Sequence, residues 1–263
     1  MGSATKQALK ALSDDLGTWQ GADMHAAREL LDLVERLGAA PQVRTALAEP
    51  DADQDRKRAL IERLFGPVAG EPARALLGAA AARRWSDDAD FGRGVQELGV
   101  RAVAQFSGQA PEMATQLLSA AEAIGEHGEL ELALSSKLTS ADAKRQLADR
   151  LFGGKVSEAT MIVLRHLIAN PMGRRARRAL AWAADVVTDQ AKRTVATVTS
   201  AVPLPADQVE RLQAALSRKY GRDVQIATLV DPAVMGGVRV ELGDDVIDDT
   251  VAARLHDLRR SIA

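Results

Sequence analysis

A 40-residue stretch occurs twice in this chain with the same spacing of charged and apolar residues. The clearest segments are Asp55–Gly66, DRKRALIERLFG, and Asp142–Gly153, DAKRQLADRLFG, which lie 87 residues apart. At that offset, without a gap, 14 of the 40 positions from 29 to 68 are identical to their counterparts. One constant offset over this length indicates a duplicated unit rather than shared composition. The repeat therefore predicts a modular chain.

Apolar residues recur at helical spacing as far as about Arg193. Glycine follows two of the stripes in each copy, at Gly38 and Gly66 and again at Gly125 and Gly153, as expected at helix ends. Each copy is therefore predicted to be a bundle of short antiparallel helices. The stripes are Leu9, Leu12, Leu16 and Trp19; Leu30, Leu33, Val34 and Leu37; Leu60, Ile61, Leu64 and Phe65; and Phe91, Val95, Leu98 and Phe106.

Two details refine the bundles. The helix from Phe91 to Phe106 is expected to close the first bundle and open the second. Thr139 and Asp142 have the spacing of a capping box ahead of the helix that ends at Gly153, and Asp51 or Asp53 is expected to cap its counterpart in the first copy.

From Arg193 the pattern changes to that of a small α+β domain. The stretch Arg193–Val202 is dense in β-branched residues and predicts a strand. Pro203 and Pro205 lead into a helix, and two alternating strands follow. The predicted apolar faces are Val209, Leu212 and Leu216 on the helix; Val224, Ile226, Thr228 and Val230 on one strand; and Val238, Val240 and Leu242 on the other.

The chain is predicted to end in a hairpin and a helix. Gly243–Asp245 forms the turn, Val246–Ile247 the returning strand, and Asp248 or Asp249 caps the last helix. The overall expectation is a mainly α chain: two tandem short-helix bundles, 1–106 and 107–192, followed by a small α+β domain, 193–263. A length of 263 residues, with 46% hydrophobic and 27% charged residues, suits several soluble domains.

Composition excludes several classes of function. A formal net charge of −2 gives no field that would hold the chain on nucleic acid. The absence of cysteine excludes a disulfide framework, a thiolate nucleophile and a cysteine zinc site. No apolar run approaches the roughly 20 residues needed to cross a bilayer, and the start lacks the apolar region of a signal peptide, so any membrane association is expected through a partner. The histidines show no ligand spacing: His25, His127, His166 and His256.

Three clusters resemble binding sites but have simpler interpretations. Four aspartates lack the spacing of a calcium loop, and a turn followed by a helix cap explains them. A glycine pair precedes a strand rather than a helix, which favours a backbone bend over a phosphate loop. A run of arginines predicts a solvated helix face, with an acidic protein partner as the alternative. These clusters are Asp244, Asp245, Asp248 and Asp249; Gly236 and Gly237; and Arg174, Arg175, Arg177 and Arg178.

No serine, histidine and carboxylate arrangement suggests catalysis, so we expect no catalytic, cofactor-binding or metal-binding residue. The run Val224–Gly243 instead resembles the signature of the δ subunit family of F-type ATP synthases, which includes the mitochondrial oligomycin-sensitivity-conferral protein. The segments Val198–Leu204 and Val246–Asp248 resemble the flanking strands, and the likeness extends from about 112 to 263. The residues that follow resemble the family's final helix: Val251, Arg254, Leu255, Leu258 and Arg259. The signature positions are Val230, Asp231, Pro232, Gly236, Gly237, Val238, Val240 and Gly243.

This resemblance implies a non-catalytic peripheral-stalk subunit, or stator, that couples rotation to ATP synthesis without a cofactor. In the family the helical domain receives N-terminal helices of α subunits, and the C-terminal domain holds the b subunit. The resemblance places this chain peripherally on the cytoplasmic face of the cell membrane, with Arg254, Leu258 and Arg259 of the last helix as candidate contacts to b. It does not identify the α-subunit groove, or which bundle provides it. The alternatives are a stand-alone cytoplasmic helical scaffold and, with the least support, a small-molecule enzyme.

Overall fold

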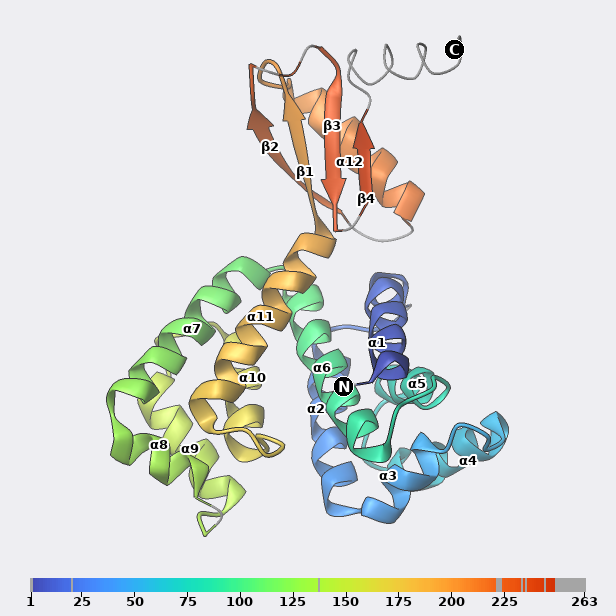
Figure 1. Ribbon diagram of the computed structural model, residues 1–263, viewed down its shortest axis with the longest axis vertical. Helices are drawn as coiled ribbons and strands as arrows, with labels where there is room; N and C mark the ends of the chain where they lie inside the picture. Colours follow the sequence, from blue (N-terminus) through green and yellow to red (C-terminus); the bar gives the residue numbers. More distant parts are fainter. Residues whose placement is uncertain are drawn as a thin grey trace. The chain divides into compact units, whose positions relative to one another are not determined.

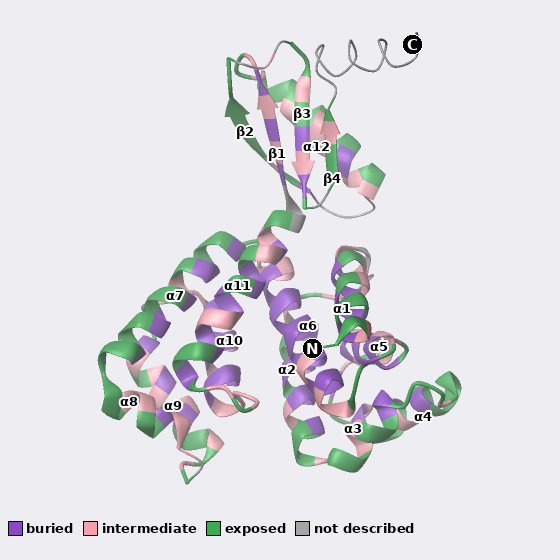
Figure 2. Ribbon diagram, viewed as in Figure 1, coloured by how far each residue is buried: buried purple, intermediate pink, exposed green. Residues whose placement is uncertain are grey.

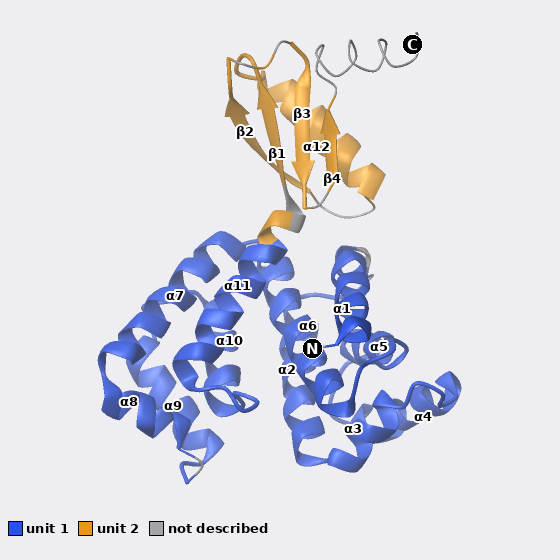
Figure 3. Ribbon diagram, in the orientation of Figure 1, with its two compact units in different colours: residues 1–190 blue, residues 191–263 orange. Residues whose placement is uncertain are grey.

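The computed structural model describes residues 2–19, 21–136, 138–220, 224–232, 234, 236–243 and 245–248. Its internal contacts divide the chain into two compact units, unit 1 from Met1 to Gln190 and unit 2 from Ala191 to Ala263 (Figure 3). Unit 1 is helical and unit 2 contains a four-stranded sheet, which confirms the predicted fold class. The finer division of the helical part at 106/107 stays a prediction.

The helices of unit 1 follow the internal repeat (Figure 1). Helix α3 and helix α8, and likewise α4 and α9, begin and end at positions 87 apart, and the ends of the other pairs agree within one residue. The first repeat contains α2 (Met24–Ala39), α3 (Pro41–Ala48), α4 (Gln54–Phe65), α5 (Glu71–Ala81) and α6 (Asp88–Ser107). The second contains α7 (Ala110–Glu126), α8 (Gly128–Ser135), α9 (Ala141–Phe152), α10 (Glu158–Ala169) and α11 (Ala176–Thr194). Helix α1 (Ser3–Asp15) and the short 3-10 helix η1 (Leu16–Thr18) precede both.

Helix α6 belongs to both bundles. It packs against α1, α2, α3 and α5 of the first bundle and against α7 and α10 of the second. Figure 2 shows it buried on nearly all sides, and even the polar residues Gln96, Glu97 and Arg101 are buried. A helix without a solvated face must lie at the centre of a larger assembly of helices. The expectation that this helix closes one bundle and opens the next is confirmed.

Glycine lets α2 approach α6 closely. A Cβ atom built on Gly99 would lie 2.5 Å from Cδ2 of Leu31, and one on Gly94 would lie 2.0 Å from the ring of Trp85. Leu31 is 1% exposed and Trp85 is 5% exposed, so neither has room to withdraw. The distance between α2 and α6 at Gly99 therefore depends on the missing side chain, and Gly94 leaves room for the ring of Trp85 in the connection between α5 and α6.

A buried charge network joins α6 to α11. Arg101 donates to Oε1 of Glu97 over 2.8 Å and to Oδ2 of Asp189 over 2.6 Å. The side chains of Arg101 and Glu97 are 9% exposed, whereas that of Asp189 is 47% exposed, so the buried charge of the network is that of Arg101 with Glu97. Buried charges are tolerated only when paired in this way, so the network favours one relative position of the two helices.

Helix caps repeat between the copies with different residues. The carboxylate of Asp53 accepts from the backbone N–H of Arg56 over 2.9 Å, and the hydroxyl of Ser140 accepts from that of Ala143 over 3.2 Å. Asp53, not Asp51, is therefore the cap in the first copy. In the second copy the predicted cap Thr139 is wrong by one residue, because the hydroxyl at the equivalent position, 140, reaches the free amides. Gly38 and Gly125 lie within the last turn of their helices rather than after it.

Unit 2 is a mixed sheet in the order β2-β1-β3-β4. Strand β1 (Val195–Ser200) runs parallel to β2 (Gln225–Val230) and antiparallel to β3 (Val238–Leu242), which pairs with β4 (Asp245–Asp248). Helix α12 (Ala206–Tyr220) connects the parallel pair. The core consists of Ala196, Val198, Leu216, Val224, Val240 and Leu242.

Two boundaries in unit 2 differ from the predicted ones. Residues 193 and 194 end α11, so the strand begins at Val195 rather than Arg193. The predicted buried face of β2 is wrong at Thr228 and Val230, which are exposed, because β2 is an edge strand with a neighbour on one side only. The predicted last helix, with Val251, Leu255, Leu258 and Ile262, lies outside the described residues. Among those that are described, no helix combines the length and apolarity of a membrane span.

The close approach at Gly99 gives a matched pair of substitutions. Gly99→Ala is expected to lower the free energy of unfolding by about 1–3 kcal/mol, because its methyl group overlaps Leu31. Gly38→Ala, at a helical glycine with nothing within 4 Å of the added carbon, is expected to raise it by up to about 1 kcal/mol. Urea unfolding of both variants followed by circular dichroism checks this. Equal effects would mean that α2 and α6 are not in tight contact.

Candidate functional site

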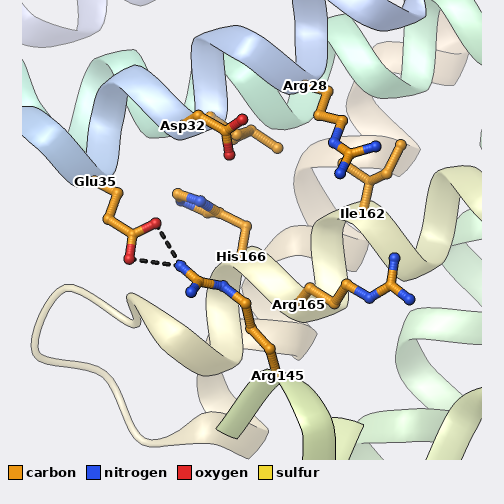
Figure 4. A pocket seen from close by; sticks show the side chains of 8 residues that line it. Arg28, Asp32, Glu35, Arg145, Ile162, Arg165 and His166 are labelled. Atoms are coloured by element: carbon orange, nitrogen blue, oxygen red, sulfur yellow. Dashed lines mark hydrogen bonds and ion pairs between the residues drawn. The ribbon is translucent and has the colours of Figure 1, made fainter. Parts of the chain in front are cut away.

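The two repeats meet at a polar junction between α2, α9 and α10. A cavity of about 90 Å³ lies there, and Figure 4 shows side chains from all three helices turned toward it. A more open hollow of about 620 Å³ shares two of its lining residues, so the junction continues toward the start of α7. The cavity is lined by Arg28, Leu31, Asp32, Glu35, Arg145, Ile162, Arg165 and His166.

An ion pair between Glu35 and Arg145 spans this junction. Nη2 of Arg145 donates to Oε1 of Glu35 over 2.6 Å and also to Oε2, while Nη1 donates to Asp142 over 2.7 Å. Burial is the largest single influence and acts to lower the pKa of Arg145, but the hydrogen bonds and charges of Glu35 and Asp142 together outweigh it, so the pKa is raised. The pair is partly buried and joins residues 110 positions apart. It therefore links the first repeat to the second.

His166 is a neutral residue inside this junction. It is 7% exposed, and the amide Nε2 of Gln96 lies 3.1 Å from its Nε2, which accepts when the ring is unprotonated. Burial, with the charge of Arg145 as a second cause, lowers the pKa of His166 to about 3. Gln96 also donates to the backbone oxygen of Asn170 over 2.8 Å. One buried amide of α6 thus holds the end of α10.

The predicted solvated helix face is correct for Arg177 and Arg178, whereas Arg174 and Arg175 precede α11, which begins at Ala176. Arg175, Arg177 and Arg178 are exposed, but the guanidinium of Arg174 lies 4.1 Å from the centroid of the Trp182 ring and donates to Oε1 of Gln96 over 3.2 Å. Burial lowers the pKa of Arg174. This residue packs because an aromatic face attracts a partly desolvated cation.

The signature residues occupy two places in unit 2. Asp231, Pro232, Gly236 and Gly237 lie in the connection from β2 to β3, whereas Gly243 follows the other end of β3. The backbone N–H of Asp231 donates to the carbonyl of Ser200 over 2.9 Å, which ties the loop to the end of β1.

The remaining signature residues belong to strands. Val230 ends β2 and is 45% exposed. Val238 is half-buried, and Val240 is buried opposite Val198. The signature therefore contributes one core side chain, Val240, one half-buried side chain that packs against the core, Val238, and one exposed apolar residue, Val230.

The glycine pair behaves as a bend. Gly236 and Gly237 have φ angles of 70° and 82°, a left-handed conformation that other residues adopt only with strain. The pair leads directly into β3, so its amides do not begin a helix. This geometry agrees with the bend interpretation rather than with a phosphate loop.

The four aspartates lie in β4 or directly beside it in the sequence of unit 2. Asp245 and Asp248 are in β4, while Asp244 and Asp249 lie outside the described residues, as do Arg254, Leu258, Arg259 and His256. Within the described ranges, no three His, Cys, Asp or Glu side chains gather as a metal site would require. Sequence reasoning did not identify the Glu35–Arg145 pair. Its only sequence signal is that both residues are identical in the two copies, at 35 and 122 and at 58 and 145.

Fold and junction together define a fused helical-repeat protein with an appended α/β unit. The family model for the ATP synthase delta (OSCP) subunit matches residues 100–262. ATP synthase subunit delta of Leifsonia xyli is 40% identical over 264 residues, covering 100% of both chains. The same subunit of Streptomyces griseus is 34% identical over 270 residues, again covering 100% of both. A chain of the Toxoplasma gondii mitochondrial ATP synthase hexamer is 22% identical over 64% of this chain and 94% of its own, with a TM-score of 0.35, too low to indicate a shared overall fold.

This protein therefore belongs to the ATP synthase delta (OSCP) subunit family. That membership confirms the resemblance inferred from Val224–Gly243 and favours a peripheral-stalk subunit of an F-type ATP synthase over a stand-alone scaffold. The family model begins inside α6, so α1 to α5 lie before it. The Leifsonia and Streptomyces relatives nevertheless align over the whole chain, including this added part.

The buried His166 makes stability depend on pH in a defined direction. Its pKa is about 3 in the folded chain and about 6.5 when unfolded, so protonation favours unfolding. The stability it contributes is complete above about pH 6.5 and is lost as the pH falls toward 3. His166→Gln keeps an acceptor for Gln96 but does not titrate.

We expect the decrease in unfolding free energy between pH 7 and pH 5 to be about 2 kcal/mol smaller in His166→Gln than in the parent. Urea titrations at both pH values measure it, with His127→Gln as the same substitution at an exposed position. If the unfolding free energies of the parent and His166→Gln change equally with pH, protonation of the buried ring does not destabilise the folded chain.

Proposed function

We propose that this chain is a non-catalytic stator component that ties the catalytic head of an ATP synthase to its peripheral stalk on the cytoplasmic face of the membrane. The observation that carries the proposal is the family match over 100–262 together with relatives named ATP synthase subunit delta that align end to end. The fused helical unit suits this role, because its two repeats share α6 and are joined by the ion pairs Arg101–Asp189 and Glu35–Arg145, so it can carry load as one body.

The proposal assigns different partners to the two ends of the chain. The helical part, with bundles 1–106 and 107–192, receives amphipathic N-terminal helices of α subunits. The domain 193–263, which carries the signature residues, holds the b subunit, with Arg254, Leu258 and Arg259 as candidate contacts. Slow dissociation is essential in a stator, and nanomolar affinity corresponds to about 12 kcal/mol. Docking of an amphipathic helix in a groove can supply it, because several apolar anchors are buried at once.

Two measurements test this function. A tagged chain is expected to recover α, β and b subunits from detergent-solubilised membranes of its own organism; failure to recover them would favour the stand-alone scaffold.

Deleting the chain is expected to leave ATP hydrolysis by the isolated catalytic head intact while abolishing its coupling to proton flow. Loss of hydrolysis in the purified head without this subunit would contradict a non-catalytic role.

A further inference from the structure

The two repeats place the same leucine in different surroundings. Leu31 of α2 and Leu118 of α7 are equivalent at the 87-residue offset. Leu31 is 1% exposed because it packs into the space left by Gly99 of α6, whereas Leu118 is 45% exposed. The repeat thus presents in its second copy an apolar side chain that is covered in its first.

The next turn of each helix carries the same glutamate. Glu35, four residues after Leu31, receives two hydrogen bonds from Arg145 of α9. Glu122, four residues after Leu118, is exposed and makes no hydrogen bond or ion pair within the part of the chain that the structure describes. Residues four apart lie on one helix face. A Leu–Glu pair therefore docks on a glycine and an arginine in the first repeat and has no such partner in the second.

The surroundings of Leu118 are acidic. Helices α7 and α8 contain five glutamates and no lysine or arginine, and α8 adds Leu132, which is 73% exposed. Arg177 of α11 is a cation beside this surface, packed against Gly125. The charge balance suits a cationic partner. The glutamates are Glu112, Glu122, Glu126, Glu129 and Glu131.

We propose that the outer face of α7, formed by Thr115, Leu118, Ser119 and Glu122, binds a basic helix of another ATP synthase subunit. This deepens the proposed function and rests on it. The occupied face of α2 shows what the partner must supply. Gly99 of α6 receives the leucine and Arg145 of α9 pairs with Glu35, so a single partner helix would carry both a small residue and a lysine or arginine on one face.

A second copy of this chain fits that face less well. At the repeat offset the counterpart of Gly99 is Leu12, a buried leucine of α1 that leaves no space for Leu118. Self-association through this face would also join two different surfaces, head to tail. Such contacts do not form a closed dimer, so they would produce open chains of molecules rather than a single stator.

The test uses the absence of cysteine in the chain. In Leu118→Cys the thiol is the only one in the subunit, and its rate of maleimide labelling is compared in the isolated chain and in the intact ATP synthase. We expect labelling to be about tenfold slower or more in the complex, because a side chain in a desolvated interface is shielded from reagent. Leu64→Cys is the matched control, since Leu64 is 41% exposed on α4, away from the proposed face; it should label equally in both.

A benzophenone maleimide on the same cysteine identifies what covers it. Crosslinking to a lysine- or arginine-rich helix of another subunit supports the inference. Equal labelling of Leu118→Cys in the chain and the complex, or a crosslink to a second copy of this chain, overturns it. If the chain does not copurify with the synthase at all, both the proposed function and the docking inference are wrong. If it copurifies normally but Leu118→Cys labels as fast in the complex as in the isolated chain, only the docking inference is wrong.

Charge reversal gives an independent readout that does not depend on labelling. Glu122→Lys, at an exposed position that leaves the fold intact, is expected to weaken retention of the chain on the complex by about tenfold or more, since a like charge replaces the anion facing a basic partner. The matched control is Glu71→Lys on α5, another exposed helical glutamate. Circular dichroism checks that both variants stay folded. Retention of Glu122→Lys equal to that of the parent would contradict a basic partner.

Discussion

The architecture of the helical unit depends on one helix being shared by two bundles. Helix α6 completes the first repeat and packs against α7 and α10 of the second, so neither repeat can move without disturbing the other. A helix shared in this way must be buried on every side, so each of its side chains must be either apolar or hydrogen-bonded to a partner. Phe91, Val95 and Leu98 supply the apolar contacts, and the buried groups Gln96 and Arg101 each find partners. Partnered polar groups give the junction a preferred geometry that hydrophobic contact alone specifies less well.

Because the two bundles share α6, equivalent positions of the two repeats have different surroundings. Glu35 of α2 pairs with Arg145 of the second repeat, and Leu31 packs on Gly99 of the shared helix α6, whereas the second repeat has no third copy to meet. A linear array of two units always leaves one such face uncovered. In a family whose members belong to an ATP synthase, that face is available to a neighbouring subunit, and its acidic character on α7 and α8 limits which neighbour suits it.

Unit 2 does not arise from the repeat. Its strands and helix follow one another between residues 195 and 248, and strand pairing holds them together. Strand β1 is central and pairs with β2 and β3, and the left-handed Gly236 and Gly237 let the chain enter β3. The exposed signature residues Asp231 and Pro232 lie in the same connection. These residues set the path of the backbone between β2 and β3. A motif of glycine, proline and aspartate can therefore be diagnostic of a family without being chemically reactive.

The sequence by itself determined the duplication, the helical and strand segments, and the family, because periodicity, turn residues and a long motif are local properties. It also predicted the dual role of the helix around Phe91. Only the tertiary structure decided that Leu31 is buried while Leu118 is exposed, and that Arg145 pairs with Glu35 across 110 residues. Identical residues carry identical local propensities, so sequence cannot distinguish them. Their burial depends on which neighbour is present, and that is a property of the assembled helices.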